Sequence, residues 1–501
     1  MALTKSVHLL AFFCGFLSLS AEILWVRLYG FSQHSIPQAF GFVLFCFILG
    51  IALGAFIGKK YCEVKHLDDE LWEISSIALI INGIFLLLFP LIFGYLGGTA
   101  FSTLGALVLI TINATVVAII FPIVHHLGAN NKNGVGRMLS NVYFSNVLGA
   151  TLGPLVTGYL VLDILTLQEA FFAFFLISIF IGLLVLEKHR LYVLLGLIIF
   201  TAPLGWETIQ RPHAILQSFS DSGDTYKSVI ETRQGIITIF KDEALGDAVF
   251  GGNVYDGRVN LNGDVNSNKI NRILLTSALQ PKPKKVLMIG LSIGTWLALV
   301  REFKGIEKID VIEINPGYEK AITNYPDQLS ATQDPRVNII YDDGRRWLKA
   351  NKSEKYDLVI MNTTWNWRSY STLLLSKEFL SIVKRHLNPR AIFCFNTTGS
   401  DDAFYTAAHV FDHAYRYLNF VYVSDHDFRE SKDTQEALDM FRNFSVNNQM
   451  IFKENSDIPK HMLEIPFVSI QDVESKAGRN LEVITDMNMI TEFKYGKKLF
   501  N

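Results

Sequence analysis

The pattern of hydrophobic and polar positions divides the 501-residue chain into two unlike parts. Residues 1–205 hold long apolar runs separated by short polar loops. Each run approaches the roughly 20 residues that a helix needs to cross the hydrocarbon core of a bilayer. We therefore predict a multi-pass membrane bundle of six to seven helices. The predicted spans are 7–29, 36–58, 74–97, 104–127, 142–163 and 167–186, followed by a shorter run at 191–205 that contains Pro203.

Glycines recur at every fourth position within two of these runs. This spacing lets helix backbones approach closely in lipid, where burial of apolar surface gives no drive for association. It predicts a compact bundle rather than separate anchors. The glycines are Gly50, Gly54, Gly58, Gly149 and Gly153.

The first run has a second interpretation as a cleaved signal peptide, because Lys5 precedes an apolar stretch that ends in small residues. The sequence AEILWVRL continues the apolar pattern past the point where cleavage would occur, so we predict a membrane helix. The same run carries Glu22 and Arg27. We expect these two side chains to pair with each other or to reach the membrane interface.

Basic residues in the loops indicate how the helices are oriented. They fall in alternate loops on one face, which the positive-inside rule assigns to the cytoplasm. If the run 191–205 crosses fully, the soluble part lies outside the cell. If this run re-enters or lies flat, the soluble part stays in the cytoplasm, which is what we expect. The basic residues are Lys5, Lys59, Lys60, Lys65, Lys132, Arg137, Lys188 and Arg190.

Charge and cysteine content exclude several classes of function. The chain has 45 basic and 47 acidic side chains, so it lacks the basic surface that nucleic-acid binding requires. Its four cysteines show neither metal-ligand spacing nor a disulfide framework. We therefore predict no nucleic-acid partner and no metal. The cysteines are Cys14, Cys46, Cys62 and Cys394.

The part after the membrane bundle divides into three predicted segments. Residues 206–280 form a linker and a small β-domain, in which Asp256 and Gly257 signal a hairpin turn between alternating strands. Residues 281–425 form a catalytic domain, and residues 426–501 form a polar C-terminal extension without a readable motif.

The catalytic segment alternates buried strands with helices. This alternation predicts a parallel, doubly wound α/β sheet of the Rossmann-like type, which binds ligands beyond the carboxyl ends of its strands. A helix at 401–418 places His409 and His413 at a spacing that can bind metal, although we expect both to face solvent. The predicted strands are KKVLMIG (284–290), KIDVIEI (308–314), VNIIY (337–341), KYDLVIM (355–361) and AIFCFN (391–396).

Three of these strands end in residues suited to an adenosine-type ligand. Gly290, Ser292 and Gly294 form a tight strand-to-helix loop that can present backbone N–H groups. Glu313 ends the next strand, where a carboxylate can accept hydrogen bonds from both hydroxyls of a ribose. Asp343 follows the third strand and can accept a hydrogen bond from an exocyclic amino group. No Walker lysine is present, which argues against ATP hydrolysis.

These motifs resemble the spermidine synthase (polyamine aminopropyltransferase) family over roughly residues 225–425. The first half, with AEILWVRL and GRMLSNVYFSNVLGATLG, is similar to bacterial integral-membrane members of that family. The resemblance implies a transferase of the bacterial inner membrane. Its co-substrate would be S-adenosylmethionine or decarboxylated S-adenosylmethionine, and its acceptor a small amine of polyamine biosynthesis. Glu313 would hold the ribose, Asp343 the adenine amino group, and the loop at 290–294 the tail of the donor.

The sequence departs from the family where the resemblance places a base. The family has an acidic residue at the position of Asn362, and an amide cannot take a proton from the attacking amine. Loss of a general base typically costs about 10²–10⁴ in rate. Replacement bases are Tyr255 and Asp256 on the predicted hairpin, or Asp401 after the fifth strand. The family's tyrosine-histidine-glutamate segment is absent, and NSNKINRIL (266–274) stands in its place.

The stretch after Asn362 offers further candidates. Trp365 and Trp367 can wall a cationic or sulfonium ligand, and Arg368 can neutralise a carboxylate, which would favour intact S-adenosylmethionine. Alternatively, the tryptophans pack against the β-domain or the membrane. Three functions stay open: aminopropyl transfer, methyl transfer at the membrane, and a binding protein or sensor without turnover. The acceptor and the oligomeric state, including a homo-oligomer, also stay open.

Overall fold

The computed structural model describes residues 6–64, 68–97, 99, 101–129, 135–186, 190–220, 225–362 and 365–499. Four of the basic residues that indicate topology, Lys5, Lys65, Lys132 and Lys188, lie outside these ranges. The chain divides into two compact units. The first covers Met1–Gln33, Gln38–Thr225 and Glu231–Arg233, and the second covers His34–Pro37, Tyr226–Ile230 and Gln234–Asn501.

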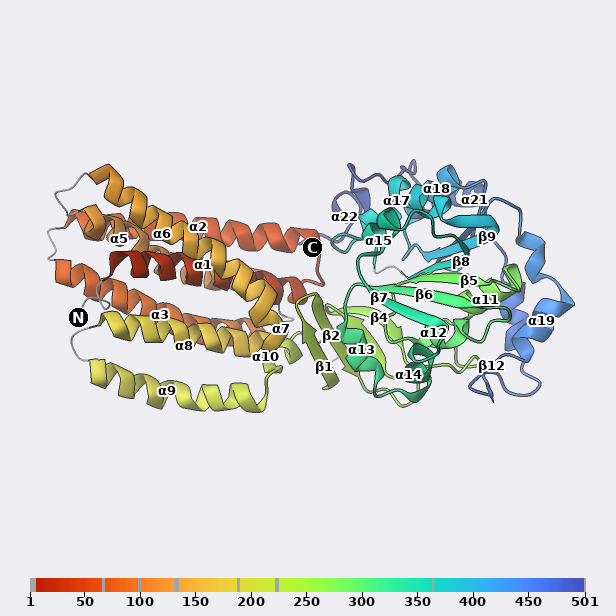
Figure 1. Cartoon of the computed structure of the whole chain (residues 1–501), viewed down its shortest axis with the longest axis horizontal. Helices are drawn as coiled ribbons and strands as arrows, with labels where there is room; N and C mark the ends of the chain where they lie inside the picture. Colours follow the sequence, from red (N-terminus) through yellow and green to blue (C-terminus); the bar gives the residue numbers. More distant parts are fainter. Residues whose placement is uncertain are drawn as a thin grey trace. The chain divides into compact units, whose positions relative to one another are not determined.

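The first unit contains seven helices that are long and apolar enough to cross a membrane, within the part of the chain described above. Large apolar side chains such as those of Phe45, Phe144 and Ile199 are more than half exposed on their surfaces, as is typical of helices that face lipid. Figure 1 shows these helices side by side. They are α1 (Val7–Ser32), α2 (Pro37–Glu63), α3 (Asp68–Tyr95), α4 (Ser102–Ala118) with α5 (Ile120–Ala129), α6 (Val135–Val156) with η1 (Thr157–Val161) and α7 (Leu162–Ile164), α8 (Leu167–Val185) and α9 (Arg190–Gln210), and a short α10 (Ala214–Gln217) follows.

Both glycine series lie where two helices approach each other most closely. A Cβ atom at Gly149 of α6 would lie 1.9 Å from the carbonyl oxygen of Phe12 in α1. On α2, a Cβ atom at Gly54 would lie 2.4 Å from the carbonyl oxygen of Thr115 in α4. Only a residue without a side chain fits at these distances, so the predicted close helix packing is confirmed.

We expect Gly149→Ala to lower the thermal unfolding midpoint of the detergent-solubilised chain. The added methyl group would push α1 and α6 apart, and overpacking of this kind typically costs about 1–3 kcal/mol. Gly196→Ala is the matched control, because nothing lies within 4 Å of the Cβ position of Gly196 on α9. Equal midpoints for the two variants would contradict the close approach of α1 and α6.

Arg27 finds its partners at the end of the bundle rather than along its own helix. Its Nη2 atom donates to the carbonyl oxygen of Thr232 at 2.6 Å and lies 4.0 Å from Oε2 of Glu231. Glu231 also accepts a hydrogen bond from the backbone N–H of Leu167, at the start of α8. Glu231, which belongs to the first unit, therefore connects α1 and α8 within that unit.

The second unit is built on a seven-stranded, mostly parallel sheet with the order β10-β11-β9-β8-β5-β6-β7. The five strands from β9 to β7 run parallel, and β11 pairs antiparallel with both β9 and β10. The predicted doubly wound α/β fold is confirmed for this unit. The strands are β5 (Lys285–Ile289), β6 (Lys308–Glu313), β7 (Val337–Tyr341), β8 (Tyr356–Met361), β9 (Leu387–Asn396), β10 (His413–Tyr417) and β11 (Phe420–Ser424).

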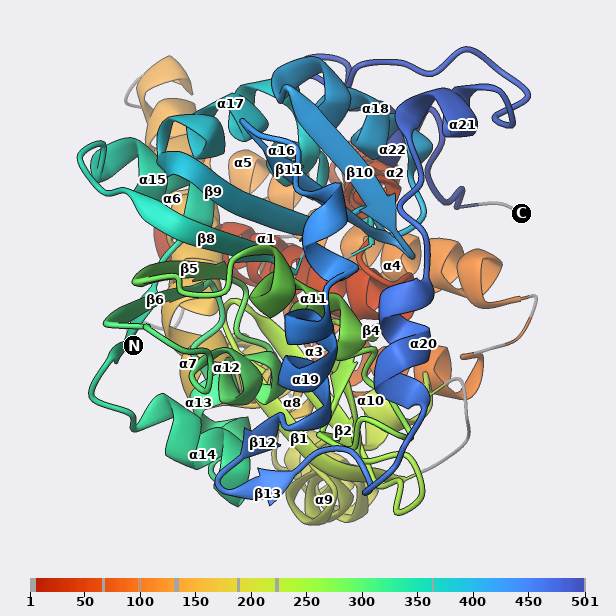
Figure 2. The same cartoon turned by 90° about the vertical axis from the view of Figure 1, so that its right-hand side faces the viewer.

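Helices cover both faces of this sheet (Figure 2), and each face has its own apolar core. On one face lie α11 (Asn271–Leu279), α12 (Thr295–Val300), α13 (Gly317–Ile322), α14 (Pro326–Thr332), α19 (Gln435–Arg442) and α20 (Ile458–Glu464). On the other lie α15 (Gly344–Ala350), α16 (Thr372–Leu375), α17 (Lys377–Arg385), α18 (Asp401–Val410), α21 (Ile470–Glu474) and α22 (Ile490–Phe493).

Residues 426–501, for which the sequence predicts a separate extension, belong to the same unit as the sheet. Phe441 and Phe452 are buried in one core, and Val473 and Ile490 in the other. A polar segment with a few apolar residues is sufficient to cover the edges of a sheet, because only those residues need to be buried. The segment also contains η2 (Arg429–Lys432), β12 (Ser445–Val446) and β13 (Gln449–Met450).

The small β-sheet has the order β1-β2-β3-β4, and its last turn corrects the sequence prediction. The turn is formed by Gly252 and Asn253, whose φ angles of 59° and 63° suit a two-residue hairpin loop. Asp256 and Gly257 instead lie within β4, where Asp256 is the extra residue of a bulge opposite Val249 and Phe250. The strands are β1 (Tyr226–Thr232), β2 (Gly235–Phe240), β3 (Ala248–Gly251) and β4 (Val254–Arg258).

The predicted helix at 401–418 is also wrong in its second half. Helix α18 ends at Val410, Phe411 is extended, and His413 begins β10, where it pairs with Ser424. His409 and His413 therefore do not share a helix face. The pairing of β10 with β11 has overridden a local pattern that suits a helix.

Candidate active site

The loop after β5 has a backbone that favours glycine. The φ angles of Gly290, Ser292 and Gly294 are +94°, +49° and +79°, and α12 begins directly after Gly294. A Cβ atom at Gly290 would lie 3.0 Å from the carbonyl oxygen of Asn362, so the ends of β5 and β8 approach closely there. This loop lies at the carboxyl edge of the sheet, where the fold binds ligands.

Glu313, the last residue of β6, holds this loop from beside it. The carboxylate is 5% exposed. Oε2 accepts from the backbone N–H of Leu291 at 2.8 Å and from that of Ser292 at a longer 3.4 Å, and Oε1 accepts from the backbone N–H of Asn315 at 2.8 Å. Oε1 can accept a second hydrogen bond, and at Oε2 a ligand hydroxyl can replace the long contact from Ser292. Glu313 can therefore position the loop and accept from two ligand hydroxyls together.

Burial raises the pKa of Glu313 from its ordinary value of 4.5 to about 7, and the negative charge of Asp256 adds to the effect. Backbone N–H groups of Asn315 and Leu291 oppose this rise because they stabilise the carboxylate. The free site thus holds a carboxyl group that is partly protonated near neutral pH.

We expect the affinity for an adenosine ligand to increase as pH rises from about 6 to about 8, because only the ionised carboxylate accepts freely from both ribose hydroxyls. Since the folded pKa lies above the ordinary value, the ligand-free protein binds the extra proton between these values and loses stability as pH rises through them. Calorimetric titrations across this range test the affinity. A Glu313→Gln variant, which cannot titrate, should give a flat profile.

Asp343 lies next to Glu313 on the neighbouring strand end. Tyr341 of β7 pairs with Glu313, and the N–H of Asp342 donates to the Glu313 carbonyl oxygen at 3.1 Å. Asp343 is exposed and caps α15 by accepting from the N–H of Arg346 at 2.7 Å. Its second oxygen is available to a ligand amino group.

The bulge in β4 turns Asp256 toward a tyrosine that the sequence analysis did not single out. The hydroxyl of Tyr318 donates to Oδ2 of Asp256 at 2.5 Å. Burial, with the charges of Asp256 and Glu313, raises the pKa of Tyr318 well above its ordinary range, so it stays a neutral donor. The sequence signal for Tyr318 is its place on the helix that follows Glu313. The β-bulge that brings Asp256 to Tyr318 cannot be predicted from the spacing of residues along the sequence.

Arg368 lies against this pair. A Cβ atom at Gly252 would be 2.4 Å from its Nη2 atom, so the guanidinium packs on the β3–β4 turn. Burial lowers the pKa of Arg368, and electrostatic interactions with Tyr318 and Asp256 oppose this effect. The sequence predicts that Arg368 neutralises a ligand carboxylate. In the structure it lies near Asp256, an acidic residue of the protein itself.

Asn362 is held at the end of β8 by a chain of amide side chains. Its backbone N–H donates to the carbonyl oxygen of Ile289 at 3.1 Å. Its Oδ1 atom accepts from Nδ2 of Asn396 at 3.4 Å, and Oδ1 of Asn396 accepts from Nδ2 of Asn419 at 2.8 Å. Neither Asn396 nor Asn419 stands out in the sequence, because strand and turn positions far apart bring them together.

A small cavity of about 20 Å³ lies among these groups. Two polar atoms on its wall, Ser292 Oγ and Trp296 Nε1, are buried and have no hydrogen-bond partner among the described residues. Buried polar groups are normally paired, so two such atoms around one cavity favour it as a place where a ligand or water binds. The lining residues are Asp256, Gly257, Asn268, Gly290, Leu291, Ser292, Ile293, Thr295, Trp296 and Asn362.

The remaining predicted residues lie beside this edge. Tyr255 on β4 is 39% exposed, and burial of its hydroxyl end raises its pKa. Trp365 and Trp367 stack with their ring centroids 6.1 Å apart, and Nζ of Lys497 lies 4.9 Å from the ring of Trp367. Thr363 and Thr364 of the same stretch lie outside the described residues. Asp401, the third alternative base, pairs with Arg416 at 2.6 Å.

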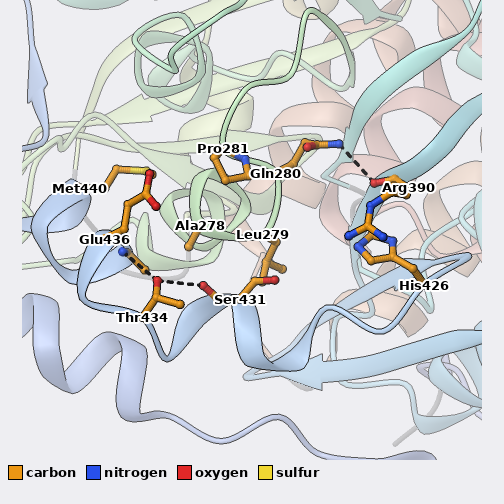
Figure 3. A pocket seen from close by; sticks show the side chains of 11 residues that line it. Ala278, Leu279, Gln280, Pro281, Arg390, His426, Ser431, Thr434, Glu436 and Met440 are labelled. Carbon is orange, nitrogen blue, oxygen red and sulfur yellow. Dashed lines mark hydrogen bonds between the residues drawn. The ribbon is translucent and has the colours of Figure 1, made fainter.

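A larger cavity of about 290 Å³ lies near the amino ends of β5 and β9 (Figure 3). Gln280 donates to the carbonyl oxygen of Arg390 at 3.2 Å there, and His426 and Glu436 lie on its wall. It is at the edge of the sheet opposite to Glu313, away from the loop and the strand ends. No group of three or more His, Cys, Asp or Glu side chains in the described part of the chain is arranged to hold a metal ion.

Comparison with known proteins finds similarity to transferases over part of the second unit. The model of the spermine/spermidine synthase domain matches residues 273–416. A polyamine aminopropyltransferase from Clostridium botulinum (strain Alaska E43 / Type E3) is 39% identical over 88 residues, which make up 17% of this chain and 31% of that protein. Putrescine N-methyltransferase 2 from Nicotiana attenuata is 33% identical over 115 residues, 23% of this chain and 31% of that protein. The chain thus spans about a third of the length of these curated relatives.

Two solved structures align with half of this chain. A spermidine synthase in complex with the transition state analogue AdoDATO is 19% identical, with a TM-score of 0.40 over 50% of this chain and 88% of that chain. The spermidine synthase from Thermotoga maritima is 18% identical, with a TM-score of 0.39 over 50% of this chain and 87% of that chain.

Proposed function

From the match of residues 273–416 to the spermine/spermidine synthase domain, we propose that the protein is a membrane-bound transferase that takes a group from an S-adenosyl donor. One observation supports this most strongly. The buried carboxylate of Glu313 lies beside the loop at 290–294, next to a cavity whose Ser292 and Trp296 atoms have no partner in the described chain.

The donor fits this edge of the sheet in one orientation. Glu313 accepts from the two ribose hydroxyls, and the free oxygen of Asp343 accepts from the adenine amino group. The sulfonium and its tail then extend over the loop at 290–294 toward Asn362. Trp365, which is 40% exposed, lies beyond Asn362 in sequence and can face the cationic sulfonium.

Transfer from a sulfonium depends mainly on position. The acceptor lone pair attacks a carbon on sulfur, the carbon–sulfur bond breaks, and its electron pair returns to sulfur as a neutral thioether. Holding the two reactants in line supplies several kcal/mol without a strong base. Asn362 can orient the acceptor but cannot take its proton. If a base is used, Asp256 with its partner Tyr318 is the group that lines the cavity.

Aminopropyl transfer to a polyamine or related amine is the first candidate reaction, in line with the domain match and the C. botulinum relative. Methyl transfer is the second candidate. It is favoured by the similarity to putrescine N-methyltransferases. A binding protein without turnover is the third possibility, since Glu313 and Asp343 are sufficient for binding.

One experiment separates the three. The purified full chain is incubated with putrescine and either S-adenosylmethionine or its decarboxylated form, and products are identified by mass spectrometry. Methylthioadenosine with spermidine supports aminopropyl transfer, and S-adenosylhomocysteine with a methylated amine supports methyl transfer. Binding without either product supports the sensor. Absence of binding and of product overturns the proposed function.

We further propose that the first unit lies in a bacterial inner membrane. Helix α9 continues through Pro203 and is long enough to cross. A crossing α9 puts the second unit on the outer side, and an α9 that lies flat keeps it in the cytoplasm. A reporter fused after residue 501 distinguishes the two, because its activity depends on the compartment.

A further inference from the structure

The amide chain that ends at Asn362 has a fixed direction. It begins at Arg272, whose Nη1 atom donates to Oδ1 of Asn419 at 3.1 Å. A guanidinium can only donate, so the oxygen of Asn419 must face Arg272 and its NH₂ must face Asn396. The backbone N–H of Thr398, which also can only donate, independently fixes Oδ1 of Asn396 as an acceptor at 2.9 Å.

The same direction is imposed on Asn362. Since the oxygen of Asn396 is occupied by Thr398 and Asn419, its NH₂ must donate to Oδ1 of Asn362. The oxygen of Asn362 is then engaged, and its two N–H groups have no partner among the described residues. Where the family resemblance places a proton acceptor, this chain presents a hydrogen-bond donor.

A second hydrogen-bond donor on the cavity wall, Trp296, also favours a ligand group that accepts hydrogen bonds. The indole N–H of Trp296 can only donate, it is unpaired within the described chain, and the side chain is 7% exposed. Ser292 Oγ, also unpaired in that part of the chain, can donate as well. Asn362, Trp296 and Ser292 line one cavity together with Asp256, so the part of a ligand that meets these three donors must supply acceptor atoms.

The charge behind this wall is positive. Arg272 is 9% exposed, and its guanidinium lies 5.0 Å from the centroid of the Trp296 ring. Its hydrogen bonds go to the carbonyl oxygens of Lys269 and Asn268 and to Asn419, and within the described chain no carboxylate pairs with it. A buried cation without an acid favours an anion nearby.

We propose that this cavity binds the α-carboxylate of an intact S-adenosylmethionine tail, so that the chain uses a carboxylate-bearing donor in preference to the decarboxylated one. Of the two candidate reactions, this preference favours methyl transfer over aminopropyl transfer. This inference rests on the proposed function, because it presumes that the donor tail reaches the loop at 290–294. The carboxylate accepts from Asn362, Trp296 and Ser292. The α-ammonium lies toward Asp256, whose Oδ1 atom is not used by Tyr318. A decarboxylated tail carries only the ammonium, which leaves the three donors unpaired.

Calorimetry with the full detergent-solubilised chain tests this. S-Adenosylmethionine and decarboxylated S-adenosylmethionine are titrated separately, with S-adenosylhomocysteine and decarboxylated S-adenosylhomocysteine as a stable pair that differs only by the carboxylate. We expect the carboxylate-bearing member to bind at least about tenfold more tightly, as the loss of a charge-assisted hydrogen bond implies. Equal binding, or tighter binding of the decarboxylated donor, overturns the inference and leaves the proposed function intact. No binding of any of the four compounds overturns the proposed function itself.

Two variants test whether the hydrogen-bond donors Trp296 and Asn362 cause the preference for the carboxylate-bearing ligand. Trp296→Phe removes one N–H and keeps a ring, and Asn362→Asp replaces donors with acceptors. Each should reduce the preference for the carboxylate by about tenfold or more, and the second should reverse it. Asn480→Asp makes the same chemical change at an exposed position and should leave the preference unchanged. If Trp296→Phe and Asn362→Asp keep the preference of the parent chain, the assignment of these residues is wrong.

Discussion

Replacing Glu313 with glutamine is expected to weaken binding of every S-adenosyl compound by about a hundredfold, which corresponds to about 3 kcal/mol. The carboxylate is the single acceptor group at the end of β6, and both of its oxygens already hold backbone N–H groups of the loop. Glutamine keeps one oxygen and introduces an NH₂ that cannot accept. The variant therefore loses hydrogen bonds to the ribose and also holds the loop at 290–294 less firmly. Calorimetric titration with S-adenosylhomocysteine measures the effect.

The control for this variant is Glu454→Gln, which makes the same change at an exposed position of the second unit. Thermal unfolding of both variants separates loss of the site from loss of the fold. A Glu313→Gln protein that unfolds at a lower temperature but binds normally when folded would show that Glu313 only supports the loop. Unchanged affinity in a folded variant would remove Glu313 from the ligand site.

The second large effect is expected from Asn362→Asp, measured as turnover with decarboxylated S-adenosylmethionine and putrescine. Aspartate can accept the existing hydrogen bond from Asn396 with one oxygen and take the proton of the attacking amine with the other. Restoring a general base typically contributes about 10²–10⁴ in rate, so we expect spermidine formation to rise by at least about a hundredfold. The rise should be in kcat more than in KM, because proton transfer affects the transition state.

Asn480→Asp is again the matched control, with no expected change in rate. If Asn362→Asp leaves spermidine formation unchanged or lowers it, Asn362 does not occupy the position of the base. If the variant raises spermidine formation and at the same time weakens binding of the carboxylate-bearing donor, one side chain sets both the proton acceptor and the choice of donor.

Much of the fold follows from the sequence because its signals are local. Runs of about 20 apolar residues predict membrane helices, and the described part of the chain has seven of suitable length and composition. Glycines at every fourth position predict close helix packing, which Gly149 and Gly54 show. Apolar strands that alternate with helices predict a parallel sheet, and chain order alone then brings the ends of β5, β6, β7 and β8 to one edge. Glu313, Asp343 and the loop at 290–294 can be predicted as neighbours for this reason.

The sequence failed where a residue's role depends on a partner far along the chain. Asp256 marks a turn by composition, but the pairing of β3 with β4 makes it a bulge residue that faces Tyr318. Residues 426–501 show no motif, yet their few apolar side chains complete both cores of the sheet. A helix pattern at 401–418 yields to strand pairing after Val410.

The amino-acid sequence by itself determined the two-part architecture and the edge of the sheet where a nucleoside would bind, since hydrophobic periodicity and strand order need no knowledge of distant contacts. Only the tertiary structure decided whether that edge presents hydrogen-bond donors or acceptors to the ligand. Arg272, Asn419, Asn396 and Asn362 are separated by up to about 150 positions, and nothing in their spacing predicts a hydrogen-bonded chain. The direction in which an amide points is set by the groups that can only donate to it, and folding alone brings those groups into contact.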